Sequence, residues 1–323
     1  MKLFKDLKQD LPASVVVFLV AVPLCLGIAL ASGAPMFAGI ISGIIGGLII
    51  GGLSGSQLSV SGPAAGLTAV VLTGIDTLGS FEALLTATAL AGIVQLLLGF
   101  IRAGSITAFF PSPVIKGMLA GIGLIIIFKQ IPHAVGYDSD WEGDLSFMQE
   151  EGSNTLTALV QMFNYFTPGA LLIGAISFAI LIIWRIPSIK DKPFFKNVPA
   201  PLAVVIFGIL CNLSLEQFFP AIALGSSHLV ELPVVSDWGE VKGLLRTPDY
   251  GALANVDTYV VALTIGIIAS LETLLSIDAI DKIDPERRLS PPNQELKAQG
   301  TGNIIAGLIG GLPITAVIVR SST

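Results

Sequence analysis

Two short stretches that lie far apart in the chain decide the fold: Val-Ser-Gly-Pro-Ala-Ala-Gly-Leu-Thr at residues 60–68 and Gly-Gly-Leu-Pro-Ile-Thr-Ala at residues 310–316. Each has small residues, then a proline, then a short apolar stretch that carries a threonine. Proline favours the first turn of a helix, where its missing N–H costs nothing. We therefore predict an extended segment followed by a half-helix within residues 58–73 and again within residues 313–320.

A half-helix of this kind offers a ligand its free backbone N–H groups and the positive end of its dipole, which is typical of an anion site. The small residues would let a substrate or a neighbouring backbone approach closely. Interrupted segments at matching places in two halves of a membrane protein also indicate the substrate site of a transporter. The competing interpretation is two ordinary Gly-Pro loops.

The composition of the chain places these segments in a membrane. Only 12% of the 323 residues are charged, against about 25% in an average soluble domain. Apolar residues make up 53%, and the mean hydropathy is +0.83. Too few polar side chains exist to cover a soluble globule, and the same numbers exclude a disordered chain. A net charge of −6 without a basic stripe argues against nucleic-acid binding.

Apolar runs predict a series of membrane-spanning helices. Basic residues gather at Lys2, Lys5 and Lys8 and in the segments after residues 184 and 276, whereas residues 132–167 are acidic. Because basic loops stay on the cytoplasmic side, we expect a cytoplasmic N-terminus. With this orientation the N-termini of the two half-helices would point at one another. The predicted spans are Leu11–Ala31, Met36–Leu53, Ala83–Ile101, Val114–Phe128, Ala170–Trp184, Leu202–Leu213, Val260–Leu275 and Thr301–Leu312.

Ionisable residues inside these spans are functional candidates, because burying a charge in a bilayer is costly. Glu272 is the deepest, and Ser276 lies four residues on, on the same helical face. A carboxylate here can bind Na⁺ or carry a proton; the alternative is a structural role, in which it fixes the position of another helix. Arg320, in the last half-helix, could attract an anion, pair with Glu272 or reach the cytoplasmic interface.

Several motifs together resemble the sulfate permease (SulP) family of inorganic anion transporters, the bacterial relatives of prestin and pendrin. The resemblance rests on residues 60–68, Pro111–Gly121, Asn293–Asn303 and Gly310–Thr315, and covers nearly the whole chain. It implies an all-α polytopic inverted-repeat transporter with seven plus seven segments, in which segments three and ten are half-helices preceded by short extended segments. Residues 1–323 would form a transmembrane transport domain, with the first repeat at about 11–213. The second repeat, about 257–323, would be incomplete, and no STAS domain would be present in the chain. The resemblance also implies a bacterial inner membrane and the homodimers that are common in the family.

The same resemblance implies a set of site residues. The anion would lie between the third and tenth segments, with side chains of the first and eighth segments around it. Glu272 would bind the coupling ion, Na⁺ or H⁺, and no other cofactor is implied. The substrate-binding positions are Thr68, Leu24, Ile28, Ser276, Ala316, Val317, Ile318 and Arg320.

The leading hypothesis is a secondary active transporter of small inorganic oxyanions, sulfate or bicarbonate, coupled to Na⁺ or H⁺ by alternating access. The alternatives are a nucleobase or organic-anion transporter of the same architecture and an anion channel. A channel would need a continuous polar stripe along its helices, and the sequence shows none. We do not expect an enzyme, because we find no nucleophile–base set, metal cluster or phosphate loop in the sequence of the spans.

Overall fold

The computed structural model describes residues 7–109, 112–138, 154–165, 167–190, 198–225 and 243–322, together with residues 192, 195, 228 and 239. Lys2, Lys5, Pro111 and most of the acidic segment between residues 139 and 153 lie outside the described residues.

Within these residues, six helices are long and apolar enough to cross a membrane. They agree with six of the predicted spans, although most extend a few residues further than predicted. They are α1 (Leu7–Ala31), α2 (Met36–Ile45) continuing through a π turn (Gly46–Ile50) into α3 (Gly51–Leu53), α5 (Phe81–Phe100), α8 (Pro168–Arg185), α11 (Ala200–Phe218) and α13 (Val256–Ile283).

Two further helices correct the predicted boundaries. The span predicted at residues 114–128 is the longer helix α6 (Ser112–Ala134). The span predicted at Thr301–Leu312 is wrong at both ends, because helix α14 covers Pro292–Ile309. It ends where Gly310 takes a left-handed conformation with φ of +97°, which a residue with a side chain rarely adopts. The shorter helices are α7 (Thr155–Gln161) and α9 (Pro187–Lys190), with 3₁₀ turns at Ala103–Phe109 and Tyr250–Ala254.

The two half-helices are present, each preceded by a strand. Strand β1 (Ser61–Pro63) leads through a 3₁₀ turn (Ala65–Leu67) into α4 (Thr68–Leu78), and strand β2 (Ile314–Ala316) leads into α15 (Ile318–Ser322). The strands pair antiparallel, with Gly62 opposite Thr315. Because each strand continues into its own helix, α4 and α15 leave the strand pair in opposite directions with their N-terminal ends toward it.

The predicted starts of the half-helices are wrong. Neither Pro63 nor Pro313 opens a helix: Pro63 is the last residue of β1, and Pro313 immediately precedes β2. Thr315 is therefore a strand residue, while Thr68 begins α4 as a helical residue. The reason is tertiary, because the strands pair with each other and side chains of α13 and α14 hold the backbone of β2 and the Ser61 hydroxyl of β1.

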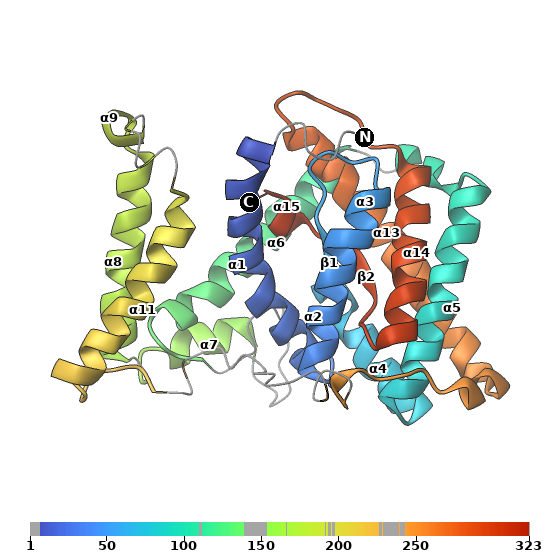
Figure 1. Ribbon diagram of the computed structural model, residues 1–323, viewed down its shortest axis with the longest axis horizontal. Helices are drawn as coiled ribbons and strands as arrows, with labels where there is room; N and C mark the ends of the chain where they lie inside the picture. Colours follow the sequence, from blue (N-terminus) through green and yellow to red (C-terminus); the bar gives the residue numbers. More distant parts are fainter. Residues whose placement is uncertain are drawn as a thin grey trace.

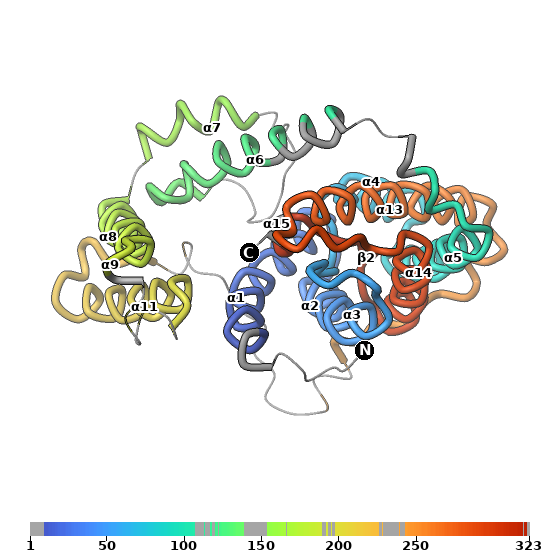
Figure 2. The backbone as a smooth tube through the Cα atoms, turned by 90° about the horizontal axis from the view of Figure 1, so that it is seen from above, coloured from blue at the N-terminus to red at the C-terminus, as the bar shows by residue number. Residues whose placement is uncertain are grey.

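The helices form two groups (Figure 1). In the core group, α5 packs along α14 and α13, with α1, α2 and the strand pair beside them. The outer group contains α6, α7, α8, α9 and α11, and Figure 2 shows it as a separate arc, with α6 and α7 along one side of the molecule and α8 and α11 beyond α1. The two groups touch where α11 meets α1 and where α6 meets α13.

Glycines set the close packing of the core group. A Cβ on Gly92 of α5 would come within 2.6 Å of the Gly300 oxygen and the Ile304 nitrogen of α14. A Cβ on Gly307 would come within 2.5 Å of the α5 backbone at Leu85 and Ala89. Backbone therefore lies on backbone along this helix pair, as in membrane interfaces built from small residues.

Candidate functional site

One face of α14 supports both strands and the loop before β1. Glu295, Gln299 and Asn303 follow one another at four-residue spacing, so that they share one side of the helix, and all three are fully buried. The Glu295 Oε1 accepts hydrogen bonds from the Ser54 hydroxyl at 2.6 Å and from the backbone N–H of Gly55 at 2.7 Å. Gln299 donates to the Ser61 hydroxyl of β1 at 2.7 Å.

Asn303 binds the first residue of β2 at two points. Its Oδ1 accepts from the Ile314 N–H at 2.6 Å, and its Nδ2 donates to the Ile314 carbonyl at 2.9 Å. The same Nδ2 also donates to Gln95 Oε1 of α5 at 2.6 Å. On the other side, the Ser42 hydroxyl of α2 donates to the Leu312 carbonyl at 2.9 Å. Three helices thus fix the entry of the chain into β2.

Glu272 of α13 lies against the start of the first half-helix. A Cβ on Gly66 would come within 3.0 to 3.1 Å of the three carboxyl atoms of Glu272, so the carboxylate lies directly against this glycine. The Oε2 of Glu272 is enclosed and has no hydrogen-bond partner in the described part of the chain. Ser276, one turn on, is buried on the same helix.

Thr68 opens α4, and its side chain is 5% exposed. Its hydroxyl Oγ1 is buried without a partner among the described residues. Among those residues, no side chain caps the 3₁₀ turn or α4 itself. The Leu67 N–H donates to the Ala64 carbonyl at 3.1 Å, and the Thr68 N–H donates to the Ala65 carbonyl. The unpaired Thr68 hydroxyl therefore lies at a helix start that has no side-chain cap, close to the Glu272 carboxylate.

Arg320 lies at the other end of the strand pair. Its side chain is 2% exposed and lies so close to Gly62 of β1 that a Cβ there would clash with the guanidinium. The guanidinium is within hydrogen-bonding reach of the Cys25 thiol of α1, while its Nη2 has no partner among the described residues. No ion pair joins Arg320 to Glu272 within the described chain, so the structure does not support that predicted pairing. The two side chains lie against different glycines, Arg320 against Gly62 and Glu272 against Gly66.

The other predicted residues are apolar and surround the junctions. Ile28 belongs to a buried cluster with Leu67, against which Val317 packs. Leu24 and Ile318 are half-buried, and Ala316 is fully buried in β2.

A groove of about 400 Å³ lies between α4 and the first half of α13. Ala69 and Val70, the residues directly after Thr68, line one part of it. Thr73, Thr77, Asp257 and Thr264 add polar groups further along. The groove therefore runs along α4 from the residues next to Thr68.

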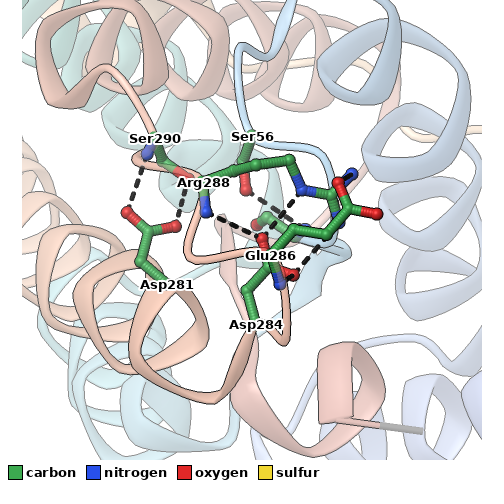
Figure 3. Close-up of polar contacts among 7 residues, drawn as sticks. Ser56, Asp281, Asp284, Glu286, Arg288 and Ser290 are labelled. Carbon is green, nitrogen blue, oxygen red and sulfur yellow. Dashed lines mark hydrogen bonds and ion pairs between the residues drawn. The ribbon is translucent and has the colours of Figure 1, made fainter.

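Hydrogen bonds to two aspartate side chains hold the loop between α13 and α14. Figure 3 shows Asp281 and Asp284 pointing from the end of α13 toward Ser290 and Arg288, with Ser56 alongside. Asp281 accepts from the hydroxyl and the N–H of Ser290 at 2.6 and 2.7 Å. Hydrogen bonds from the Arg288 side chain, and then from the N–H groups of Glu286 and Arg288, lower the pKa of Asp284 to about 2.

Sequence reasoning missed the polar face of α14. The signal was present, because a carboxylate and two amides recur every four residues from 295 to 303 in a helix that packs inside a membrane protein. It also missed Thr273, whose hydroxyl accepts from the Ala316 N–H at 3.3 Å.

The paired strands and the half-helices define a class of protein: the polytopic membrane transporters that are built around interrupted segments. The family model "Sulfate permease family" matches residues 7–323, and the chain belongs to that family. The family is one of transporters and not of enzymes. The chain is 30% identical over 321 residues, 98% of its length, to a putative sulfate transporter, YvdB, of Bacillus subtilis. It is 25% identical, over 96% of its length, to the bicarbonate transporter BicA of Picosynechococcus.

Solved structures support the same fold. The transmembrane domain of a cyanobacterial bicarbonate transporter BicA matches 99% of this chain and 76% of that chain with a TM-score of 0.63 and 24% identity. The structure of SLC26A9 matches 97% of this chain and 49% of that chain with a TM-score of 0.61 and 16% identity. The chain spans about half the length of the curated relatives it matches, 55% of YvdB and 52% of BicA.

Proposed function

We propose that this chain carries the substrate and coupling-ion sites of a secondary active transporter of small inorganic oxyanions, sulfate or bicarbonate. The observation that carries the proposal is the position of Glu272, whose carboxylate lies on Gly66 at the uncapped start of α4 with one oxygen unpaired. The relatives named as sulfate and bicarbonate transporters support the choice of substrate class.

In this proposal the oxyanion binds at the strand–helix junctions. The Thr68 hydroxyl donates a hydrogen bond, the N-terminal end of α4 contributes the positive end of its dipole, and the Arg320 guanidinium supplies positive charge. The apolar side chains of Leu24, Ile28, Val317 and Ile318, with Ala316, shape the site and exclude water. An oxyanion is the ligand that such a set of donors fits best.

Glu272 and Ser276 bind the coupling cation, which is Na⁺ or a proton on the carboxylate. The negative charge of Glu272 beside an anion site opposes anion binding until a cation neutralises it. Cation and anion therefore raise one another's affinity, as thermodynamic linkage requires, and the two move together as a symport. Alternating access moves the core group against the outer group.

The orientation follows from charge. Basic residues after α8 and in the loop after α13 support a cytoplasmic location for those ends and for the N-terminus of α1. Residues 11–213 would then form the first repeat, and residues from 257 onward would begin the second, in a bacterial inner membrane.

Uptake of radiolabelled sulfate and bicarbonate by the full-length protein in liposomes tests the proposal. We expect uptake of one anion to be accelerated by an inward Na⁺ gradient or by an inward proton gradient. Substitution Glu272→Gln should abolish this dependence on the cation. Uptake at the same rate without either gradient would refute cation coupling. Uptake of neither anion would refute the substrate assignment.

The anion site itself is tested by Thr68→Val, which removes the unpaired hydroxyl while keeping the side-chain shape. Loss of one hydrogen bond predicts an anion KM raised by about 5-fold to 10-fold. Thr301→Val is the control, because Thr301 lies on α14, outside the groove lining and the site residues, with its hydroxyl bonded to the Lys297 carbonyl. Equal KM values for the two variants would place the anion elsewhere.

A further inference from the structure

A two-stranded ribbon inside a membrane has two open edges, and each unpaired N–H or C=O there is costly. The Val317 N–H donates to the Val60 carbonyl at 3.0 Å, which makes these two residues a hydrogen-bonded pair. In antiparallel strands every second pair is bonded, and residues between them turn their backbone groups outward. By the register, Ile314 and Ala316 are such residues, so the outer edge of β2 consists of their N–H and C=O groups.

Two side chains satisfy this edge in place of a third strand. Asn303 takes both the N–H and the C=O of Ile314, and the Thr273 hydroxyl accepts the N–H of Ala316. Both side chains are fully buried and come from different helices, α14 and α13. Neither Thr273 nor Asn303 is among the site residues predicted from the sequence.

Thr273 directly follows Glu272 on α13. Glu272 contacts the first half-helix at Gly66, while Thr273 holds β2, which leads into the second. Consecutive residues of one helix therefore touch the two interrupted segments. A shift of α13 that accompanies a change of charge at Glu272 would reach β2 through the Thr273–Ala316 hydrogen bond.

We propose that Thr273 and Asn303 are positioning residues that replace a third strand on β2, and that Thr273 transmits cation binding at Glu272 to the anion site. The second part rests on the proposed function. Neither residue contacts the transported ions in this proposal; both act through the backbone of β2.

Two measurements on the full-length protein test this. The first is hydrogen exchange of the backbone across residues 312–318. The second is the factor by which a saturating coupling cation lowers the anion KM. The variants are Thr273→Val, which removes the hydroxyl, and Thr273→Ser, which keeps it. Ser270→Ala is the control, because Ser270 is buried on the same helix and its hydroxyl donates to the Gly266 carbonyl within its own helix.

We expect Thr273→Val to accelerate exchange across residues 312–318 by about 5-fold to 10-fold, as loss of one hydrogen bond predicts. It should also reduce the effect of the cation on anion KM by at least about threefold, while Thr273→Ser and Ser270→Ala resemble the wild type. Asn303→Asp keeps the acceptor for the Ile314 N–H but loses the donor to its carbonyl, and should accelerate exchange in the same segment.

Unchanged exchange in both Thr273→Val and Asn303→Asp would overturn the edge role. Accelerated exchange with an unchanged cation effect on KM would overturn the transmission role and leave a purely structural contact. Should the wild-type protein move neither anion, the proposed function fails by itself, and the exchange result alone decides whether these side chains hold the edge.

Discussion

Helices α5 and α8 are nearly equal in mean hydropathy, 2.0 and 1.9. However, 56% of the residues in the apolar stretch of α5 are buried in the protein, against only 6% in that of α8. α5 belongs to the core group and packs along α14 and α13, whereas α8 packs chiefly on α11 in the outer group. Hydropathy therefore predicts that both helices cross the membrane but does not predict which one is enclosed by protein. Lipid is as apolar as the protein interior, so the distinction depends on small residues and polar bonds.

The largest difference in stability is expected when one methyl group is added to a glycine of the core group and one to a glycine of the outer group. Gly92→Ala places a Cβ within 2.6 Å of α14 backbone atoms, which cannot move without separating the helices. We expect a loss of stability of about 3 kcal/mol, or failure to fold. Gly208→Ala on α11 meets only the Ile173 side chain at 3.8 Å, and should leave stability unchanged or raise it by about 0.5 kcal/mol. Thermal unfolding in detergent measures both, and equal losses would refute the difference in packing.

Buried polar bonds give the next largest contrast. Glu295→Ala leaves the Ser54 hydroxyl and the N–H groups of Gly55 and Ser56 without their buried acceptor, which should cost about 2 kcal/mol. The control in the outer group is Glu216→Ala, since Glu216 is exposed and accepts a hydrogen bond from Asn212 of its own helix.

That control should change stability by less than about 0.5 kcal/mol. Glu295→Gln should recover part of the loss, because it retains an acceptor oxygen. If Glu295→Ala unfolds at the same temperature as Glu216→Ala, the polar face of α14 does not hold the loop before β1.

The existence of both half-helices could be predicted from the sequence, because small residues and proline interrupt two apolar runs. Their starting points could not. Pro63 lies in a strand position opposite Ile314, where it turns its nitrogen outward and needs no N–H. That position depends on β2, more than 250 residues away in the chain, and on the amide of Asn303. Local preference for proline in the first helical turn gave the wrong boundary for this reason.

The candidate site divides in the same way. Glu272 could be found because a lone carboxylate in an apolar span is conspicuous, and its contact with Gly66 gives that choice a geometric basis. Pairing with Glu272 was one of the three roles that the sequence left open for Arg320, and it depended on tertiary contacts, at Gly62 for Arg320 and at Gly66 for Glu272, about which the sequence carries no information. The partners of Gln299 and Asn303 are likewise set by tertiary contacts, although their four-residue spacing was a usable signal.

The smallest predicted effect concerns two ionised carboxylates, one in each region. The Arg288 side chain and two backbone N–H groups lower the pKa of Asp284, which links α13 to α14, to about 2. Desolvation raises the pKa of Asp138 in the outer group, but hydrogen bonds from His133 and His228 outweigh it and lower the pKa overall. The side chain of Asp284 is 3% exposed and that of Asp138 is 26% exposed.

An aspartate in an unfolded chain has a pKa of about 3.9. Because the folded pKa of Asp284 is lower, its ionised form stabilises the fold fully above about pH 4, and this contribution disappears as the pH falls toward 2. Asp284→Asn should therefore unfold at a lower temperature than the wild type at pH 6, with the gap closing between pH 4 and pH 2. Asp138→Asn should give a smaller gap at pH 6, because solvent screens its more exposed hydrogen bonds. Thermal unfolding from pH 2 to pH 6 distinguishes the two, and a gap for Asp284→Asn that does not change with pH would mean that the charge of Asp284 does not stabilise the link between the two core helices.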